Sequence, residues 1–310
     1  MKIHKDTHVL LLKGGFGSER EVSLKSAEAC SLAIKDMGLN LTEFDLGKFK
    51  IIDIVNINPD VCFNALHGKI GEDGTVQGLL NLLKIPYTHS GVTTSAIAMN
   101  KIHFKRVITH ATENSDDPIF FPKNLEISYG KYLSVKNYKG PYVIKPINGG
   151  SSVGVIIVKD QNKIPLSKNF NYDQMMAEAY VGTKELTVTI LKNAPLTVTE
   201  IKPKKNNEFY NFDAKYEKNG SFHEIPALIP NDIFEKSKSW ALRAHNIIGC
   251  KGISRTDFRY DTKKNQLYML EINTQPGMTI YSLAPEQARF CNVSMKEMVR
   301  TLLEEATYEC

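Results

Sequence analysis

The feature of this sequence that most restricts its fold is a change in the order of predicted strands and helices near residue 95. Before that point, short apolar runs such as Val9–Leu12 and Val61–Leu66 alternate with segments whose apolar residues recur at helical spacing. Strand–helix alternation of this kind is typical of an open parallel sheet. After residue 124 strands dominate. The order therefore predicts an α/β unit followed by α+β units.

Local signals predict the boundaries of elements in the first unit, which we place at 1–95. Ser18 and Glu21 have the spacing of a capping box, which predicts a helix over 19–38 with Gly38 at its C-terminal end. A short strand is predicted at Ile85–Thr88. A further helix is predicted at Thr94–His110.

The rest of the chain is expected to form two further domains, over 96–181 and 182–310. Residues 202–224 are long, polar and weakly periodic, which predicts a lid loop. Predicted strands are Tyr142–Lys145, Val153–Val158, Met175–Tyr180, Glu185–Leu191, Ile253–Tyr260 and Leu267–Asn273, the last two as a hairpin, and predicted helices are Asp232–Ile248 and Ser294–Glu305.

Composition argues against several classes of protein. No apolar run approaches the roughly 20 residues that span a bilayer, so no membrane contact is expected. The run Val9–Leu12 is too short for a secretory signal. Five cysteines without a CxxC pair are typical of a reducing cytoplasm. The formal charge of +5 comes from dispersed lysines, which favours a pocket for a small polyanion over a nucleic-acid surface.

Two predicted strands in the last third of the chain carry acidic side chains. Glu271 and Asn273 lie two residues apart, so they share one face of their strand. If the hairpin places Asp257 opposite or diagonal to Glu271, the two carboxylates lie about 4.5–8 Å apart. An oxygen-only donor set suits Mg²⁺ or Mn²⁺ rather than zinc, with phosphate oxygens completing the shell. A solvated polar face on an edge strand is the alternative.

A glycine-rich turn joins two of the predicted strands. Lys145 ends the first strand, and Gly149, Gly150, Ser151 and Ser152 follow it. Backbone N–H groups of glycines can approach an anion closely, and a nearby lysine adds charge. No G-K-[ST] sequence follows, so the turn is not a Walker A loop. A plain flexible hairpin is the alternative.

A second junction between strands has an acid on each side. Glu178 precedes this junction and Glu185 follows it. A hinge of this kind can offer backbone groups to a base edge and a carboxylate to ribose hydroxyls. Ordinary surface acids are the alternative.

Together these motifs resemble the ATP-grasp ligases, and most closely the D-alanine–D-alanine ligase family. The resemblance implies an ATP-grasp fold, in which an N-terminal open parallel-sheet domain adjoins two α+β domains that sandwich the nucleotide. Seven segments in family order carry it over nearly the whole chain: GGFGSEREVSL (14–24), NALHGKIGEDGTVQGLL (64–80), GVTTSAIAMNK (91–101), YVIKPINGGSSVGV (142–155), FYNFDAKY (209–216), GISRTDF (252–258) and LEINTQPGMTIYSL (270–283).

The resemblance implies roles in nucleotide and metal binding. Lys101 and Lys145 are implied to bind the phosphates of ATP. Asp257, Glu271 and Asn273 are implied to hold two Mg²⁺ ions, for which Mn²⁺ can substitute. The residues implied to contact ATP are Lys101, Lys145, Ser151, Ser152, Glu178, Ala179, Val181, Glu185 and Lys215.

The resemblance also implies sites for two D-alanine molecules. Glu19 is implied to take the first ammonium group, although helix-dipole complementarity alone would also favour an acid there. His67 is implied to lie near the first carboxylate, and Ser282 and Leu283 are implied to receive the second. Catalytic roles are implied for Glu19, Ser151, Arg255, Tyr216 and Gly277.

The implied reaction has two steps. The carboxylate of the first D-alanine attacks the γ-phosphorus of ATP, which gives D-alanyl phosphate and ADP. The amine of the second D-alanine then attacks the acyl carbon, while Arg255 and the Gly277 N–H face the developing oxyanion. Ser151 and Tyr216 are implied to tie the lid to Glu19 and exclude water. The family likeness further implies a cytoplasmic homodimer that supplies peptidoglycan synthesis.

Other functions stay open at this point. They are a D-alanine–D-lactate or other ATP-grasp carboxylate–amine ligase, a non-catalytic nucleotide sensor, and a nucleic-acid binder. Two residues depart from the family pattern: Ala179 stands where some relatives carry lysine, and Gln275 lies in a turn where small residues are common, with no predicted consequence. The stretch KPKKNNE is also more basic than expected for the lid.

Overall fold

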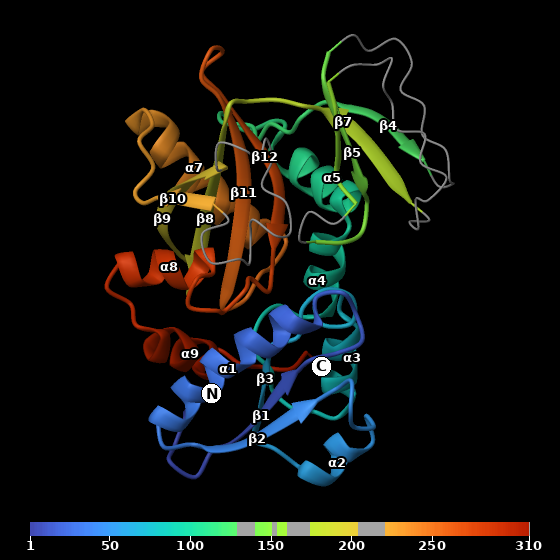
Figure 1. The fold of residues 1–310 in the computed structure, drawn as a ribbon, viewed down its shortest axis with the longest axis vertical. Helices are drawn as coiled ribbons and strands as arrows, with labels where there is room; N and C mark the ends of the chain where they lie inside the picture. The colour runs from blue at the N-terminus through green and yellow to red at the C-terminus, as the bar shows by residue number, and fades with distance from the viewer. Residues whose placement is uncertain (129–139, 151–153, 160–173, 204–220, 310) are drawn as a thin grey trace.

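The computed structural model describes residues 1–128, 140–150, 154–159, 174–203 and 221–309. These residues form three β-sheets, and Figure 1 shows the parallel sheet at one end of the molecule and the two antiparallel sheets at the other. The change from parallel to antiparallel sheets follows the predicted change of pattern, so the predicted fold class is confirmed. The exact domain boundaries stay a prediction. No helix in this described part of the chain has the length and apolar character to span a membrane.

The first sheet is parallel and buried on both faces. Its strands, in spatial order, are β2 (Asn40–Asp45), β1 (His8–Lys13) and β3 (Val61–Asn64). Successive side chains of β1 point to opposite faces, so Leu11 packs into one core and Leu10 into another. Burial on both faces explains why β1 is a continuous apolar run.

Helices from both ends of the chain cover this sheet. α1 (Arg20–Asp36) and α9 (Met295–Glu304) share the core on one face and contact each other. α2 (Asp53–Ile57) and α3 (Thr75–Leu82) contribute to the core on the other face. Figure 1 shows α9 lying beside α1. The first sheet is therefore completed by a helix from the far end of the sequence.

The predicted start of α1 is wrong by one residue, and its capping box does not form. Glu19 is the N-cap, and no side chain accepts a capping hydrogen bond. The Arg20 N–H donates to the Gly17 carbonyl, so this turn leaves Ser18 outside the helix. The predicted end is confirmed, because Gly38 follows the helix with a φ of 72°.

The predicted strand at Ile85–Thr88 is also wrong. Only isolated bridges form there, in which Tyr87 pairs with Cys62 on one side and Thr307 on the other. β2 was not predicted from the sequence, because its polar, mostly half-exposed residues give no clear apolar alternation.

The helix predicted over 94–110 is two helices, α4 (Val92–Met99) and α5 (Lys101–Thr112). Asn100 between them is extended, with a φ of −91° and a ψ of 102°. Its backbone pairs with that of Asn148. Its side chain accepts hydrogen bonds from two backbone N–H groups of α5 and so caps that helix.

The second sheet is antiparallel and carries the glycine-rich turn. Its strands, in spatial order, are β4 (Asn124–Ser128), β7 (Met175–Ala179), β5 (Tyr142–Pro146) and β6 (Ile156–Val158). β5 and β7 lie where strands were predicted, whereas β6 begins at Ile156, later than expected. β4 was not predicted.

The third sheet is antiparallel, with α7 (Asn231–Ile247) packed on it through the fully buried Trp240. α8 (Leu283–Phe290) also contacts this sheet, at β8 (Lys184–Leu191) and β9 (Ala194–Pro203). The two ends of the lid predicted over 202–224 lie in paired strands, and residues 204–220 lie outside the described residues. The strands, in spatial order, are β10 (Ser221–Glu224), β9 (Ala194–Pro203), β8 (Lys184–Leu191), β11 (Ile253–Asp261) and β12 (Gln266–Asn273).

The predicted hairpin of β11 and β12 forms, and its register is one of the two arrangements considered from the sequence. Asp257 lies directly opposite Glu271, and Arg255 lies opposite Asn273. The register shifts after Asp257, where Leu270 forms a bulge. The two acidic residues therefore lie directly opposite each other in the sheet.

Candidate active site

A pocket lies between the second and third sheets and collects the residues implied to bind the nucleotide. β5 and β7 supply one wall, and β11 and β12 supply the facing wall. The predicted residues that line it are Lys101, Lys145, Glu178, Ala179, Val181, Glu185, Asp257 and Glu271. We call this space the sheet pocket.

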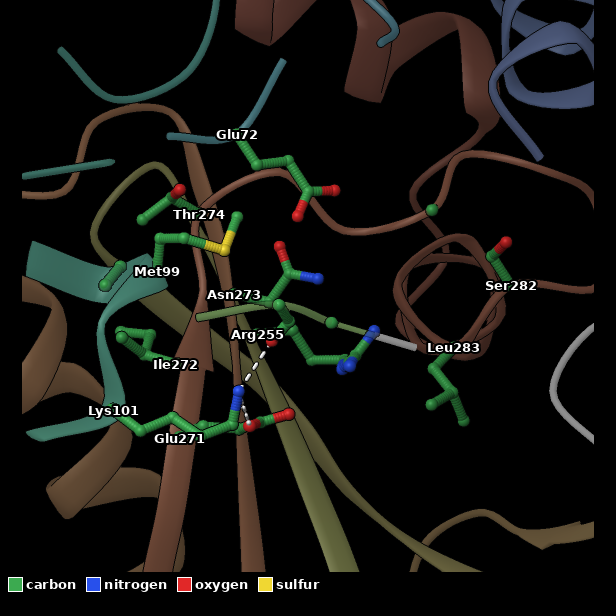
Figure 2. Close-up of a pocket in the computed structure, with 14 residues that line it drawn as sticks. Glu72, Met99, Lys101, Arg255, Glu271, Ile272, Asn273, Thr274, Ser282 and Leu283 are labelled. Atoms are coloured by element: carbon green, nitrogen blue, oxygen red, sulfur yellow. Dashed lines mark hydrogen bonds and ion pairs between the residues drawn. The ribbon is translucent and has the colours of Figure 1, made fainter. Parts of the chain in front are cut away.

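A second pocket adjoins the sheet pocket on the side of the first sheet. Its lining includes the remaining predicted residues of the C-terminal part: Arg255, Asn273, Gly277, Ser282 and Leu283. Figure 2 shows Lys101 and Glu271 together at its base, with the Glu72 carboxylate directed toward Asn273. We call this space the turn pocket. Lys101, Glu271, Gly149 and Gly150 line both pockets, so the two spaces meet at these residues.

The position of Lys101 follows from the break before α5. As the first residue of that helix, it turns its buried side chain toward the junction of the pockets. Its Nζ donates to the Gly149 carbonyl at 2.6 Å and lies 3.4 Å from Glu271 Oε2. One ammonium group thus holds both the glycine-rich turn and a predicted metal ligand.

A buried carboxylate at the floor of the sheet pocket faces two ammonium groups. Lys145 donates to one oxygen of Glu178 and Lys105 donates to the other. Burial raises the pKa of Glu178, but its two lysine partners outweigh burial and hold that pKa below the ordinary value. Glu178 is therefore ionised, and the group of three carries a net positive charge.

Asp257 is held on its own strand and from the neighbouring strand. Arg255 donates to both carboxylate oxygens, at 2.9 and 2.8 Å. Thr187 on β8 donates to Oδ1 at 2.7 Å. A bidentate pair of this kind fixes the plane of the guanidinium group. Arg255 therefore has a defined orientation at the edge of the turn pocket.

Arg259, which shares a face with Arg255 and Asp257, clamps the hinge after β7. Its Nε donates to the Val181 carbonyl at 3.1 Å, and its Nη2 donates to the Gly182 carbonyl at 2.9 Å. Its Nη1 lies 3.3 Å from Glu185 Oε2. The guanidinium carbon is 5.0 Å from the centre of the Tyr180 ring. Arg259 thus fixes the segment predicted to line adenosine.

Glu19 approaches the glycine-rich turn from the first sheet. A Cβ atom added at Gly150 would lie 3.8 Å from Glu19 Oε1 and 4.0 Å from Glu72 Oε2, so the turn passes close to both acids. At Gly68 an added Cβ would lie only 2.1 Å from Glu19 Oε2, and the φ there is 71°. Only glycine fits at that position beneath the carboxylate.

A bidentate ion pair orients the loop that carries Glu19. Arg20 donates to both oxygens of Asp45, at 2.7 and 2.6 Å, and to the Gly15 carbonyl at 3.1 Å. The hydrogen bond from Arg20 holds the pKa of Asp45 below its ordinary value. The loop between β1 and α1 is therefore tied to the end of β2.

His67 belongs to a buried chain of hydrogen bonds. Its Nδ1 is 3.0 Å from Glu72 Oε1, and its Nε2 is 2.9 Å from Ser26 Oγ. Ser26 Oγ also accepts a hydrogen bond from the Met278 N–H at 3.2 Å. Ser26 then donates to Nε2, and the proton of a neutral His67 lies on Nδ1, facing Glu72. The chain joins α1 to the backbone next to Gly277.

Ser282 lies at the start of α8 and faces Gly277. A Cβ atom added at Gly277 would be 2.8 Å from Ser282 Oγ. The Ser282 hydroxyl accepts from the Thr279 N–H at 3.1 Å and makes no capping bond to α8. The first N–H groups of α8, beginning at Leu283, make this corner suitable for a negative charge.

The predicted metal ligands have the right donor chemistry for a hard divalent cation. Asp257 and Glu271 are opposite each other, Asn273 is next to them on the same face, and all three offer oxygen. Arg255 and Lys101 neutralise the two carboxylates in this structure. Among the described residues no cluster of three or more His, Cys, Asp or Glu forms a closed cage. The set therefore fits Mg²⁺ that takes further oxygens from phosphate.

Some predicted residues cannot be placed, and other residues of the site were not predicted. Ser151, Ser152, Lys215 and Tyr216 lie outside the described residues. Reasoning from the sequence missed Glu72, Lys105, Arg259 and Ser26. Glu72 lies in the same HGKIGEDG segment as His67, and Arg259 shares the face of Asp257, so pattern alone could have suggested these two. Nothing in the sequence singles out Lys105 or Ser26.

Two antiparallel sheets that enclose lysines and carboxylates, beside a parallel-sheet unit, define an ATP-grasp enzyme. Family models agree: the one described as D-ala D-ala ligase C-terminus matches residues 128–304, and the one described as D-ala D-ala ligase N-terminus matches residues 47–90. The chain belongs to the D-alanine–D-alanine ligase family.

Individual relatives are similar over nearly their whole length. The D-alanine–D-alanine ligase of Sinorhizobium fredii (strain NBRC 101917 / NGR234) is 43% identical over 306 residues, which cover 97% of this chain and 98% of that protein. That of Rhizobium meliloti (strain 1021) is 44% identical over 308 residues, with the same coverage. The crystal structure of D-alanine–D-alanine ligase from Bacillus anthracis complexed with ATP is 25% identical, has a TM-score of 0.81, and is matched over 96% of this chain and 97% of that one.

Proposed function

We propose that this protein joins two D-alanine molecules into D-alanyl-D-alanine with ATP, for peptidoglycan precursor synthesis. The single observation that carries the proposal is the meeting of the two pockets at Lys101 and Glu271. A nucleotide in the sheet pocket would direct its terminal phosphate to that junction. One amino acid between Glu19 and His67, which line a further pocket beside Gly149 and Gly150, and a second in the turn pocket would meet the same phosphate from the other side.

The nucleotide would lie with its base at the hinge and its phosphates toward the lysines. Glu178, Ala179 and Val181 line the base end, and Glu185 lies where a ribose would reach. Lys101 and Lys145 would contact phosphates. The implied contacts of Ser151, Ser152 and Lys215 belong to this arrangement as family expectations.

The first D-alanine would bind between Glu19 and His67. The Glu19 carboxylate suits an ammonium group. His67, with its tautomer set by Ser26 and Glu72, would lie near the carboxylate that becomes phosphorylated. The lid contacts implied for Ser151 and Tyr216 would close over this molecule.

The second D-alanine would bind at the start of α8. Ser282 and the Leu283 N–H would receive its carboxylate. Its amine would then face the acyl phosphate formed from the first molecule. Arg255, oriented by Asp257, and the Gly277 N–H would stabilise the negative charge on the tetrahedral carbon's oxygen.

The reaction would follow from this placement in two steps. A carboxylate oxygen of the first molecule attacks the γ-phosphorus, so an oxygen–phosphorus bond forms, the bond from the γ-phosphorus to the bridging oxygen breaks, and ADP leaves. The second amine attacks the acyl carbon, a peptide bond forms as the nitrogen gives up a proton, and inorganic phosphate leaves with the bonding pair. Asp257, Glu271 and Asn273 would hold Mg²⁺, or Mn²⁺ in its place, which when bound neutralises charge on the phosphates.

Assembly and compartment follow the family expectation. We infer a homodimer in the cytoplasm. The described cysteines 30, 62, 250 and 291 are free, which agrees with a reducing environment.

The decisive experiment measures ADP release together with mass detection of the products. We expect ADP and D-alanyl-D-alanine from D-alanine and ATP, and no product from L-alanine. D-alanine together with D-lactate should still give mainly the dipeptide. A predominant ester product would instead identify a D-alanine–D-lactate ligase. Nucleotide binding without any ADP release would identify a sensor.

A further inference from the structure

Lys105 lies behind the wall of the sheet pocket and does not line it. It follows Lys101 by one turn of α5, and only 4% of its surface is exposed. Its Nζ donates to Glu178 Oε2, while Lys145 donates to Oε1 from the pocket side. Asn124 Oδ1 is 3.4 Å away. Among the described residues, Glu178 is therefore the link between Lys105 and the pocket.

The charges around Glu178 do not balance. Lys105 and Lys145 share a single carboxylate, so these three buried groups carry a net charge of about +1. Burial lowers the pKa of Lys105, Glu178 opposes that effect, and the like charges of Lys145 and Lys101 lower the pKa further. All three ammonium groups are thus within electrostatic range of one another. A buried excess of cations is unfavourable unless an anion completes it.

Lys145 and Lys105 approach Glu178 from different sides, and this determines which positive charge an anion in the sheet pocket can reach. Glu178 and Lys145 line the sheet pocket, whereas Lys105 is enclosed by α5, Glu178 and the ring of Phe121, 5.7 Å from its Nζ. With Lys105 present, the negative charge of Glu178 is already neutralised by an ammonium group that lies outside the pocket. Without Lys105, the carboxylate would cancel the charge of Lys145, and the floor of the pocket would be neutral.

We propose that Lys105 is a positioning residue for the nucleotide phosphates: it neutralises Glu178 from behind and so leaves the charge of Lys145 available to an anion. The inference rests on the proposed function for the identity of that anion. A purely structural role, in which Lys105 only satisfies a buried acid, is the competing explanation.

The test compares ligands that differ in phosphate number. Dissociation constants of adenosine, AMP and ADP are measured by calorimetry, without D-alanine, for the wild type and Lys105→Met. We expect adenosine affinity to change by less than about twofold and ADP affinity to fall about tenfold or more, since tenfold corresponds to about 1.4 kcal/mol. The KM for ATP should rise similarly, while the KM for D-alanine stays within about twofold.

Arg106→Met is the matched control. Arg106 is the next residue of α5 and is exposed, so the variant removes one positive charge without touching Glu178. It should leave all of these constants within about twofold. Lys105→Arg keeps the charge and should restore most of the ADP affinity.

A double variant keeps the test decisive if Lys105→Met does not fold. Lys105→Met with Glu178→Gln leaves no lone buried acid and returns the net charge to that of Lys145 alone. Its ratio of ADP to adenosine affinity should be near the wild-type ratio. If the ratio of ADP affinity to adenosine affinity stays low in the double variant, the proposal is contradicted.

Two further outcomes would overturn the proposal. If Lys105→Met weakens adenosine and ADP equally, the residue serves the base and not the phosphates. If the variant only lowers the melting temperature, its role is structural. Failure of the wild type to form dipeptide would instead count against the proposed function, because the binding ratios are measured without D-alanine.

Discussion

Gln275 joins two parts of the site through a buried amide. Its Oε1 accepts from Asn64 Nδ2 at 2.9 Å, and its Nε2 donates to the Leu66 carbonyl at the end of β3. Its own N–H donates to Asn273 Oδ1 at 2.7 Å. The turn after β12 is thereby tied to the segment that leads into His67. No rule of turn chemistry predicts this contact from the sequence, because both partners come from a distant segment.

Gln275→Met tests the strength of this tie. Methionine keeps the approximate volume but leaves the buried Leu66 carbonyl without its side-chain donor, so we expect a loss of about 1–3 kcal/mol in the free energy of unfolding. Urea denaturation measures the effect. Gln266→Met is the control, because the Gln266 amide bonds only the carbonyl of the next residue. Equal stability of the two variants would contradict the assigned role of Gln275.

Glu271→Gln tests the metal hypothesis. The change removes a negative charge from the predicted Mg²⁺ site while keeping the size of the side chain, so we expect turnover to fall by orders of magnitude. Steady-state ADP release over a range of Mg²⁺ concentrations provides the measurement. Glu304→Gln, at the end of α9, serves as the control and should leave turnover unchanged. Near-normal activity of Glu271→Gln would refute the assigned ligand.

Strands and helices with strong local patterns were predictable, and those that depend on distant partners were not. The β11–β12 hairpin was predicted because alternation and turn residues agree there, whereas its register was left open between two arrangements. The break at Asn100 was missed because apolar spacing continues across it, while the competing interaction is a bridge to Asn148. The same break directs Lys101 into the site. Sequence could therefore suggest that Lys101 is functional, but not how the chain presents it.

Asn100→Ala should weaken the start of α5. The change removes the side-chain acceptor for two backbone N–H groups, which we expect to lower the free energy of unfolding by about 1 kcal/mol. Chemical denaturation monitored by circular dichroism gives the value. Asn100→Asp retains an acceptor oxygen and should stay close to the wild type. A loss of the same size in both variants would show that capping is not the cause.

At the scale of the molecule, the change from a parallel-sheet unit to strand-rich units could be inferred from pattern, whereas the contacts between the units could not. Ser26 and Met278 come from segments far from His67 in the sequence, and only folding brings Ser26 to His67 and the Met278 N–H to Ser26. The pKa values of buried titratable groups also depend on contacts that only folding creates. Burial lowers the pKa of His89 to about 3 and that of His245 to about 4. Neither shift is visible in the sequence.

These two histidines predict a loss of stability on acidification. Their folded-state pKa values lie below the ordinary value of 6.5, so the unfolded chain binds protons first as the pH falls. Their contribution is complete above about pH 6.5 and is lost below it, at up to about 1.4 kcal/mol per pH unit for each group. Unfolding free energies measured between pH 7 and 5 should show this slope.

His245→Gln should reduce that slope by about half. The exposed His110 provides the control, since His110→Gln should leave the slope unchanged. A slope unaffected by His245→Gln would show that other groups control the response to acid.

The contact between α1 and α9 has a consequence for the growing chain. A ribosome makes β1 and α1 well before α9, the helix that completes their apolar core. Until then that face of the nascent chain stays uncovered and is a site for chaperone binding or premature association. The first sheet is thus synthesised well before it can be fully buried.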